Sequence, residues 1–249
     1  MINKIYVLES IPSDEIQTGE ELYNDTIYRY KKFYNSDIEI FFEKFESKND
    51  LQKILKQIET QSVESDAILL HIETHGNKSV LGLKNNDEID WNEFSDLLIP
   101  INSKIKNKLF LNIVACFGRY VAFTMELKKT SPYKCFISSS DVLLPREILN
   151  DNTILYDNLL RTGNIYEAYI NLFEINPKTK FYIKEVETIL SFHIIPNLDL
   201  FLKNGSLFLL KSFFDSYLNL NINLSEIEKV EDKSKHIFDK FIERFTYKN

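Results

Sequence analysis

The sequence lacks the marks of several common protein classes. It has only two cysteines in 249 residues, which argues against a disulfide framework. No stretch approaches the roughly 20 apolar residues of a membrane span, and the N-terminal apolar run is too short for a signal peptide. The net charge is -7 and no lysine or arginine cluster stands out. We therefore expect a cytoplasmic protein whose partners are neither nucleic acids nor membranes.

Internal repeats, low-complexity tracts and Gly/Ser linkers are also absent. Hydrophobic residues make up 44% of the chain, enough to bury a sizeable core. We predict one large α/β domain over residues 1–195 and a helical extension over residues 196–249 that packs on it.

Short apolar runs alternate with segments of helical periodicity. The predicted strands cover residues 5–8, 38–42, 67–70, 109–115, 135–137 and 181–192, with a hairpin over 80–88. The predicted helices cover residues 18–34, 51–58, 91–98 and 120–129, and a further helical region follows residue 153. Strands that are apolar almost throughout indicate a parallel sheet covered by helices on both faces.

Two short motifs follow predicted strands. His75-Gly76 comes after the run ending at Leu70, and Cys116-Phe117-Gly118 comes directly after the 109–115 run. Because parallel sheets place ligands at the carboxyl ends of their strands, the imidazole and the thiol are expected to meet there. The imidazole would accept the thiol proton, and the thiolate would act as a nucleophile in acyl transfer.

These motifs resemble those of the caspase-like (clan CD) cysteine peptidases, and within them the bacterial CHAT proteins and their relative separase. The shared pattern is an apolar strand, His-Gly, a second apolar strand and Ala-Cys-x-Gly, within a resemblance that spans residues 4–173. Val114 and Phe117 replace residues typical of animal caspases.

The resemblance implies a caspase-like α/β sandwich, with a largely parallel sheet of about six strands between helices. It also implies a catalytic dyad of His75 and Cys116, with the backbone amides of Gly76 and Cys116 binding the oxyanion. No cofactor and no metal ion are expected.

Three further residues are candidates for substrate binding. Glu9 and Asp141 each follow a predicted strand, and Ser140 precedes Asp141. If they converge on one pocket, the carboxylates would favour arginine or lysine before the cleaved bond. Animal caspases instead recognise aspartate through arginines.

The other histidines and the second cysteine have simpler interpretations. His71 lies within an apolar strand and is expected to be a hydrogen-bonded core residue, and Cys135 a packed strand residue. A zinc site formed by His71 and His75 is disfavoured, because residues four apart on a strand are about 13 Å apart. His193 and His236 are expected to be structural or solvated.

Three functions are compatible with these features. The first is an endopeptidase that cleaves a specific protein partner through a thioester acyl-enzyme, controlled by an activating partner and acting in bacterial defence or cell death by analogy with CHAT proteins. The second is a non-catalytic interaction module of caspase fold. The third is an acyl transferase or another thiol hydrolase on the same scaffold.

Overall fold

The computed structural model describes residues 1–124 and 130–186. The predicted extension over residues 196–249 therefore lies outside the described residues, as do the predicted strand beyond residue 186 and the predicted helix beyond residue 124. In the described part of the chain, no helix combines the length and the apolar character needed to cross a membrane.

A central sheet with the strand order β2-β1-β3-β6-β7-β8 forms the middle layer. Its first five strands run parallel, and β8 is antiparallel to β7. The strands are β1 (Lys4–Ser10), β2 (Glu39–Lys44), β3 (Ile68–Gly76), β6 (Leu109–Val114), β7 (Cys135–Ser139) and β8 (Phe181–Glu185). A hairpin of β4 (Val80–Gly82) and β5 (Glu88–Asp90) pairs with the end of β3. The predicted, largely parallel sheet is confirmed.

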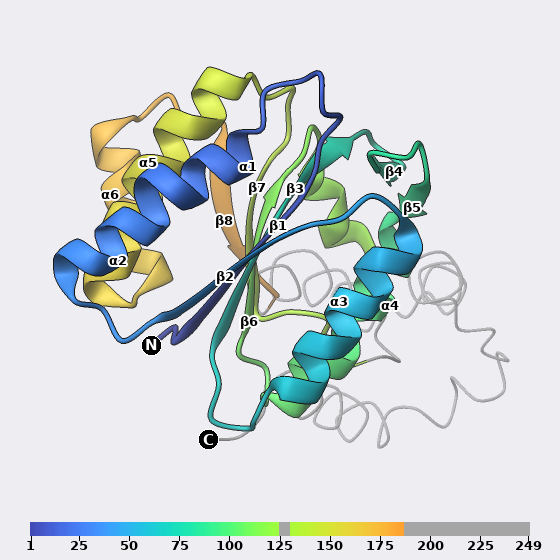
Figure 1. Cartoon of the computed structure of the whole chain (residues 1–249), viewed down its shortest axis with the longest axis horizontal. Helices are drawn as coiled ribbons and strands as arrows, with labels where there is room; N and C mark the ends of the chain where they lie inside the picture. The colour runs from blue at the N-terminus through green and yellow to red at the C-terminus, as the bar shows by residue number, and fades with distance from the viewer. Residues whose placement is uncertain (125–129, 187–249) are drawn as a thin grey trace, which may run out of the picture.

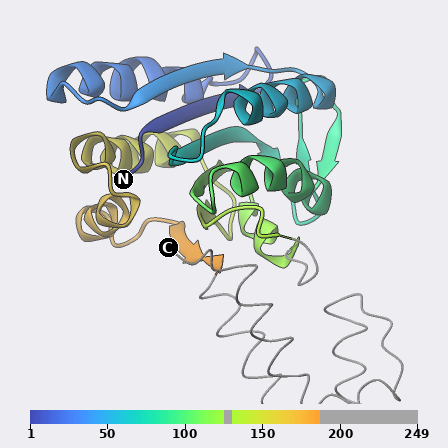
Figure 2. The same ribbon diagram turned by 90° about the horizontal axis from the view of Figure 1, so that it is seen from below.

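Helices cover both faces of this sheet (Figure 1). The helical segments are α1 (Thr18–Glu21), η1 (Leu22–Tyr28), α2 (Arg29–Tyr34), α3 (Lys48–Gln61), α4 (Trp91–Lys104), η2 (Gly118–Thr124), α5 (Pro145–Thr162) and α6 (Ile165–Ile175). On one side, α5 lies between the helix formed by α1, η1 and α2 and helix α6 (Figure 2). Helices α3 and α4 pack on the opposite face.

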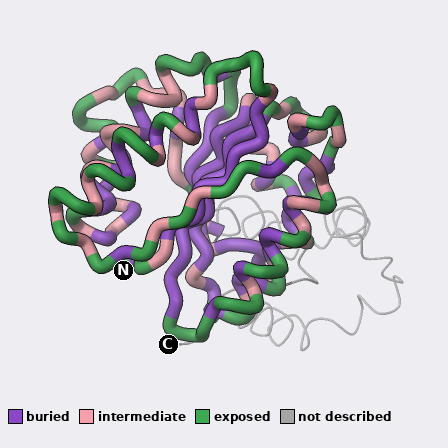
Figure 3. The backbone as a smooth tube through the Cα atoms, viewed as in Figure 1, coloured by how far each residue is buried: buried purple, intermediate pink, exposed green. Residues whose placement is uncertain are grey.

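Alternating strand residues divide the core into two parts. Tyr6 and Leu8 point toward α3 and α4, whereas Ile5 and Val7 point toward η1 and α5. The inner strands are buried in the centre of the molecule, and the outer faces of the helices are exposed (Figure 3). Burial on both faces explains why these strands are apolar along most of their length.

Several elements extend beyond their predicted ends. The first strand continues to Ser10 and the third to Gly76, so Glu9 and His75 lie within strands rather than after them. Helix α3 begins after Ser47, whose hydroxyl and the Asp50 carboxylate form a capping box, one turn before the predicted start. Helix α5 begins at Pro145, before the predicted position, because proline is well suited to a first helical turn.

Candidate active site

The ends of β3 and β6 bring the two motifs together. These strands are neighbours, with Glu73 paired to Val114, so His75 and Cys116 each follow the same register position by two residues. A Cβ atom added to Gly76 would lie 2.8 Å from the carbonyl oxygen of Cys116. The His-Gly and Cys segments are therefore in backbone contact at the carboxyl edge of the sheet, and only glycine leaves room for this contact.

His75 has a partner that the sequence did not reveal. Its Nε2 atom lies 3.1 Å from Oε1 of Glu15, which comes from the loop between β1 and α1. About half of each side chain is exposed, at 52% for His75 and 48% for Glu15. A carboxylate at Nε2 favours the tautomer with its proton on Nε2, which leaves Nδ1 free to accept a proton.

The turn after β6 sets the position of Cys116. Phe117 has a φ of 59°, in the left-handed region that non-glycine residues rarely adopt, and its amide donates to the carbonyl of Asp141 at 3.3 Å. A Cβ at Gly118 would lie 2.1 Å from the hydroxyl oxygen of Ser138. This turn is therefore held against the end of β7, with the half-buried Cys116 thiol at its start.

The two cysteines differ sharply in environment. Cys135 is fully buried in β7, and burial raises the pKa of its thiol to about 12. Cys116 is partly exposed and forms no disulfide. The predicted packed role of Cys135 agrees with this placement, and Cys116 is the thiol that a dissolved reagent can reach.

Ser140 and Asp141 lie beside this turn. Both are exposed in the connection between β7 and α5, and the Asp141 carboxylate accepts a hydrogen bond from the Val142 amide at 2.8 Å. Since the Asp141 carbonyl is bonded to Phe117, these residues lie next to the candidate nucleophile. In Figure 1, this connection and the β1–α1 loop both lie at the top of the sheet.

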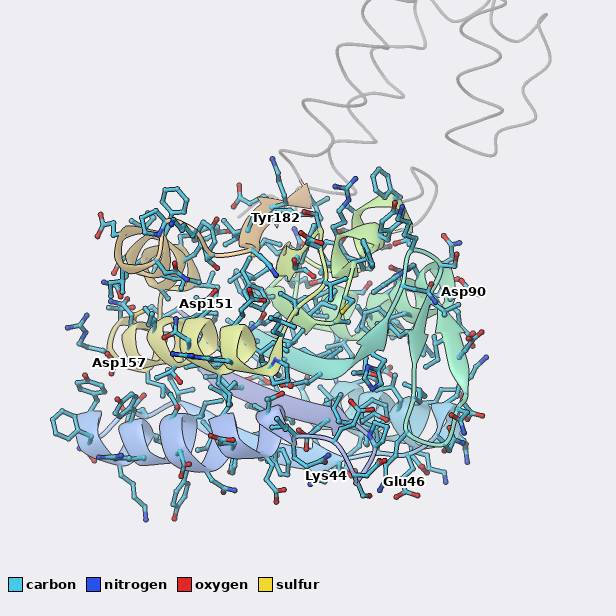
Figure 4. The ribbon with its side chains drawn as sticks, turned by 90° about the horizontal axis from the view of Figure 1, so that it is seen from above. Lys44, Glu46, Asp90, Asp151, Asp157 and Tyr182 are labelled. Carbon is cyan, nitrogen blue, oxygen red and sulfur yellow. The ribbon has the colours of Figure 1, made fainter. Side chains whose placement is uncertain are left out.

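Glu9 is placed differently from what the sequence indicated. Its side chain is fully buried within β1, and its carboxylate accepts hydrogen bonds from the Gly19 and Glu20 amides at 2.8 and 3.2 Å. Lys44, labelled in Figure 4, lies 3.5 Å from the second carboxylate oxygen. Glu9 alternates with Val7 along the strand and therefore points toward helix α1, where it anchors the helix start instead of lining a substrate pocket.

His71 belongs to a buried polar network on the same side of the sheet. The amide nitrogen of Asn112, which can only donate, lies 3.1 Å from Nδ1, so Nδ1 accepts and Nε2 carries the proton. Nε2 lies 3.3 Å from Glu73. Burial lowers the pKa of His71 to about 3, while burial and the nearby Glu9 raise the pKa of Glu73 well above its ordinary value. The two form a neutral hydrogen-bonded pair, rather than a salt bridge, at neutral pH.

This assignment gives a stability prediction for Glu73→Gln. In the unfolded chain Glu73 loses its proton above about pH 4.5, whereas the folded protein keeps it, so wild-type stability falls as the pH rises through that window. The glutamine variant does not titrate there. We expect the difference in free energy of unfolding, Glu73→Gln minus wild type, to be more positive at about pH 8 than at about pH 5 in urea titrations. An equal effect at both pH values would mean that buried Glu73 is ionised.

Among the described residues, no group of three or more His, Cys, Asp or Glu side chains is arranged to hold a metal ion. The segments that carry the Cys116 thiol and the His75 imidazole lie side by side at the edge of the sheet.

Comparison with known proteins identifies a related peptidase family and a similar fold. Residues 23–130, which include both motifs, match the sequence profile of the Peptidase C13 family. The fold is similar to the crystal structure of the Drosophila initiator caspase Dronc, with a TM-score of 0.54 and 12% sequence identity. That match covers 73% of this chain and 79% of the caspase chain. No curated protein sequence matches the chain.

Fold and sequence together define the class: this is a caspase-like α/β chain that resembles the clan CD cysteine peptidases. The resemblance inferred from His75-Gly76 and Cys116-Phe117-Gly118 is thus confirmed at this level. The more specific likeness to CHAT proteins and separase stays a prediction.

Proposed function

We propose that the protein is a cysteine endopeptidase with Cys116 as nucleophile and His75 as general base. The observation that carries the proposal is the backbone contact between Gly76 and Cys116, which joins two motifs from neighbouring strand ends. The match of residues 23–130 to a cysteine peptidase family supports it.

In this mechanism, Nδ1 of His75 accepts the Cys116 proton while Glu15 holds Nε2–H. The thiolate sulfur bonds to the substrate carbonyl carbon, and the amides of Gly76 and Cys116 donate to the resulting oxyanion. As the C–N bond breaks, the imidazolium gives its proton to the leaving amine, which leaves a thioester. Water, deprotonated by His75, then attacks the thioester, and the thiol recovers its proton.

Labelling with a peptidyl electrophile tests this proposal directly. We expect stoichiometric modification of the wild type and of Cys135→Ser, and none of Cys116→Ala, in intact-mass spectra. A non-catalytic module with an unactivated thiol would show only slow labelling, no faster than that of an unfolded control. Labelling by simple acyl donors without peptide cleavage would instead indicate the acyl transferase or thiol hydrolase.

The exposed acids beside the dyad support a preference for arginine or lysine before the cleaved bond. Asp141 and Ser140 remain candidates for this pocket, and Glu15 takes the place that the sequence assigned to Glu9. An acidic substrate side chain would be desolvated against these carboxylates without a partner, whereas a cationic one would be paired.

A peptide library measures this preference. We expect kcat/KM for arginine to exceed that for aspartate by about 100-fold, since unpaired buried charge costs a few kcal/mol. Asp141→Ala should reduce this ratio without changing stability, whereas Asp25→Ala, an exposed acid on η1, should leave it unchanged. Cleavage mainly after aspartate or apolar residues would contradict the prediction.

We further propose a specific protein as the substrate and a cytoplasmic site of action, with a bacterial defence or cell-death role by analogy with CHAT proteins. Only residues 125–134 lie between η2 and β7, which leaves little room for a processing loop and favours control by an activating partner.

A further inference from the structure

A polar groove lies beside the proposed active site and is not used by the proposed mechanism. It has a volume of about 380 Å³ and lies between the first turns of α5 and the connection from α6 to β8. Arg146, Glu147 and Asp151 line it from α5, and Lys178 and Lys180 line it from the connection. Figure 4 labels Asp151 on α5, on the side toward α6.

The acids of this groove are already occupied. Asp151 is buried, and its carboxylate accepts hydrogen bonds from the Asn176 amide at 2.7 Å and the Thr179 hydroxyl at 2.6 Å. Glu147 pairs with Lys180 at 2.8 Å, and this hydrogen bond lowers the pKa of the carboxyl and raises that of the ammonium. Glu147 is thus paired with a cation, whereas Asp151 is buried and held by neutral donors.

Arg146 and Lys178 are different. Both are exposed, and neither has a carboxylate partner within residues 1–124 and 130–186. In a chain of net charge -7, two unpaired cations on one groove form a local positive site. A negatively charged group entering the groove would meet an excess of positive charge, because Arg146, Lys178 and Lys180 line it against the two acids Glu147 and Asp151.

The groove adjoins the nucleophile through Lys180. Its ammonium donates to the carbonyl of Val142 at 2.9 Å, in the same connection whose Asp141 carbonyl is bonded to Phe117. The charges of Asp141 and Cys116 also contribute to the raised pKa of Lys180, as expected if they lie nearby. A substrate segment that passes Cys116 along the β7–α5 connection would therefore arrive at Arg146 and Lys178.

We propose that this groove is a second substrate-recognition site that binds acidic side chains of the protein substrate. The inference rests on the proposed peptidase function and extends it: the preferred substrate carries a cation at the cleaved bond and acidic residues further along the same segment. Arg146 and Lys178 would be the recognising groups, each pairing with a substrate carboxylate.

Binding of labelled peptides to full-length Cys116→Ala tests the groove without requiring cleavage. The probes are two fluorescein-labelled Gly/Ser peptides that differ only in carrying several glutamates or several glutamines, followed by fluorescence anisotropy. We expect the glutamate peptide to bind about fivefold more tightly, as for two partly exposed charge pairs, and this preference to weaken with added salt. Adding Arg146→Ala and Lys178→Ala should remove the preference.

Arg29→Ala with Lys32→Ala is the matched control. It removes the same two residue types from exposed positions on α2, which line a different groove. This control should retain the preference for the glutamate peptide. Equal binding of the two peptides, or an equal loss in the control, would overturn the proposal. A glutamate preference that depends on Arg146 and Lys178, found together with failed electrophile labelling, would instead refute the peptidase function and leave an acidic-peptide site.

Discussion

Cys116→Ala is expected to abolish peptide cleavage, because within the described part of the chain no other thiol lies at the carboxyl edge of the sheet. The alanine variant keeps the backbone amide of residue 116, so binding of substrate should survive while turnover is lost. Release of a fluorescent leaving group measures turnover, and anisotropy with an uncleaved peptide measures binding.

Cys135→Ser is the matched control for this experiment. The buried thiol of Cys135 stays protonated at neutral pH because its pKa is about 12, so its loss should leave turnover largely unchanged. Loss of activity in a correctly folded Cys135→Ser variant would show that the wrong cysteine has been identified as the nucleophile.

His75→Ala should reduce kcat by about 10²- to 10⁴-fold, the usual contribution of a general base. Glu15→Gln should produce a smaller loss, since a glutamine can still accept from Nε2–H but carries no charge to stabilise the imidazolium. Its effect should fall on kcat more than on KM. Glu20→Gln, which removes an acid of α1 that pairs with Lys44, serves as the control and should remain active.

Equal activity of Glu15→Gln and the wild type would exclude Glu15 from the mechanism and leave only His75 and Cys116. Activity of His75→Ala within tenfold of the wild type would remove the base from the mechanism, since general-base contributions are about 10²-fold or larger.

The sheet and the adjacency of the segments that carry His75 and Cys116 could be predicted because their signals are local. Strands buried on both faces are apolar throughout, and a histidine and a cysteine that follow such strands reach the same edge when the strands are neighbours. The residues at that edge can therefore be recognised from the short sequence segments around Gly76 and Gly118.

Glu9 was misplaced because the expected strand ended at the first charged residue. In the structure the strand continues through Glu9, since the free amides at the start of α1 satisfy its carboxylate. An apolar pattern cannot reveal that an acid is buried against the start of a helix. The backbone amides that bind the acid lie beyond a loop, and the sequence does not show where that loop places them.

Glu15 was missed for a related reason. Its contact with His75 joins residues 60 positions apart, and an acid in a loop looks the same in sequence whether it faces solvent or an imidazole. The groove at Arg146 was equally invisible, because its lining residues come from α5 and from the connection to β8.

In the proposed mechanism, activity depends on a contact of the Glu15 loop that is less stable than the fold itself. It contributes little to the buried core, and its contact with His75 is half exposed, whereas β1 and β3 are buried over most of their length. Regions with few buried contacts open locally at a lower free energy than the whole domain. Moderate heating or denaturant would thus detach the histidine from its carboxylate while the sheet stays intact, and inactivation would precede melting.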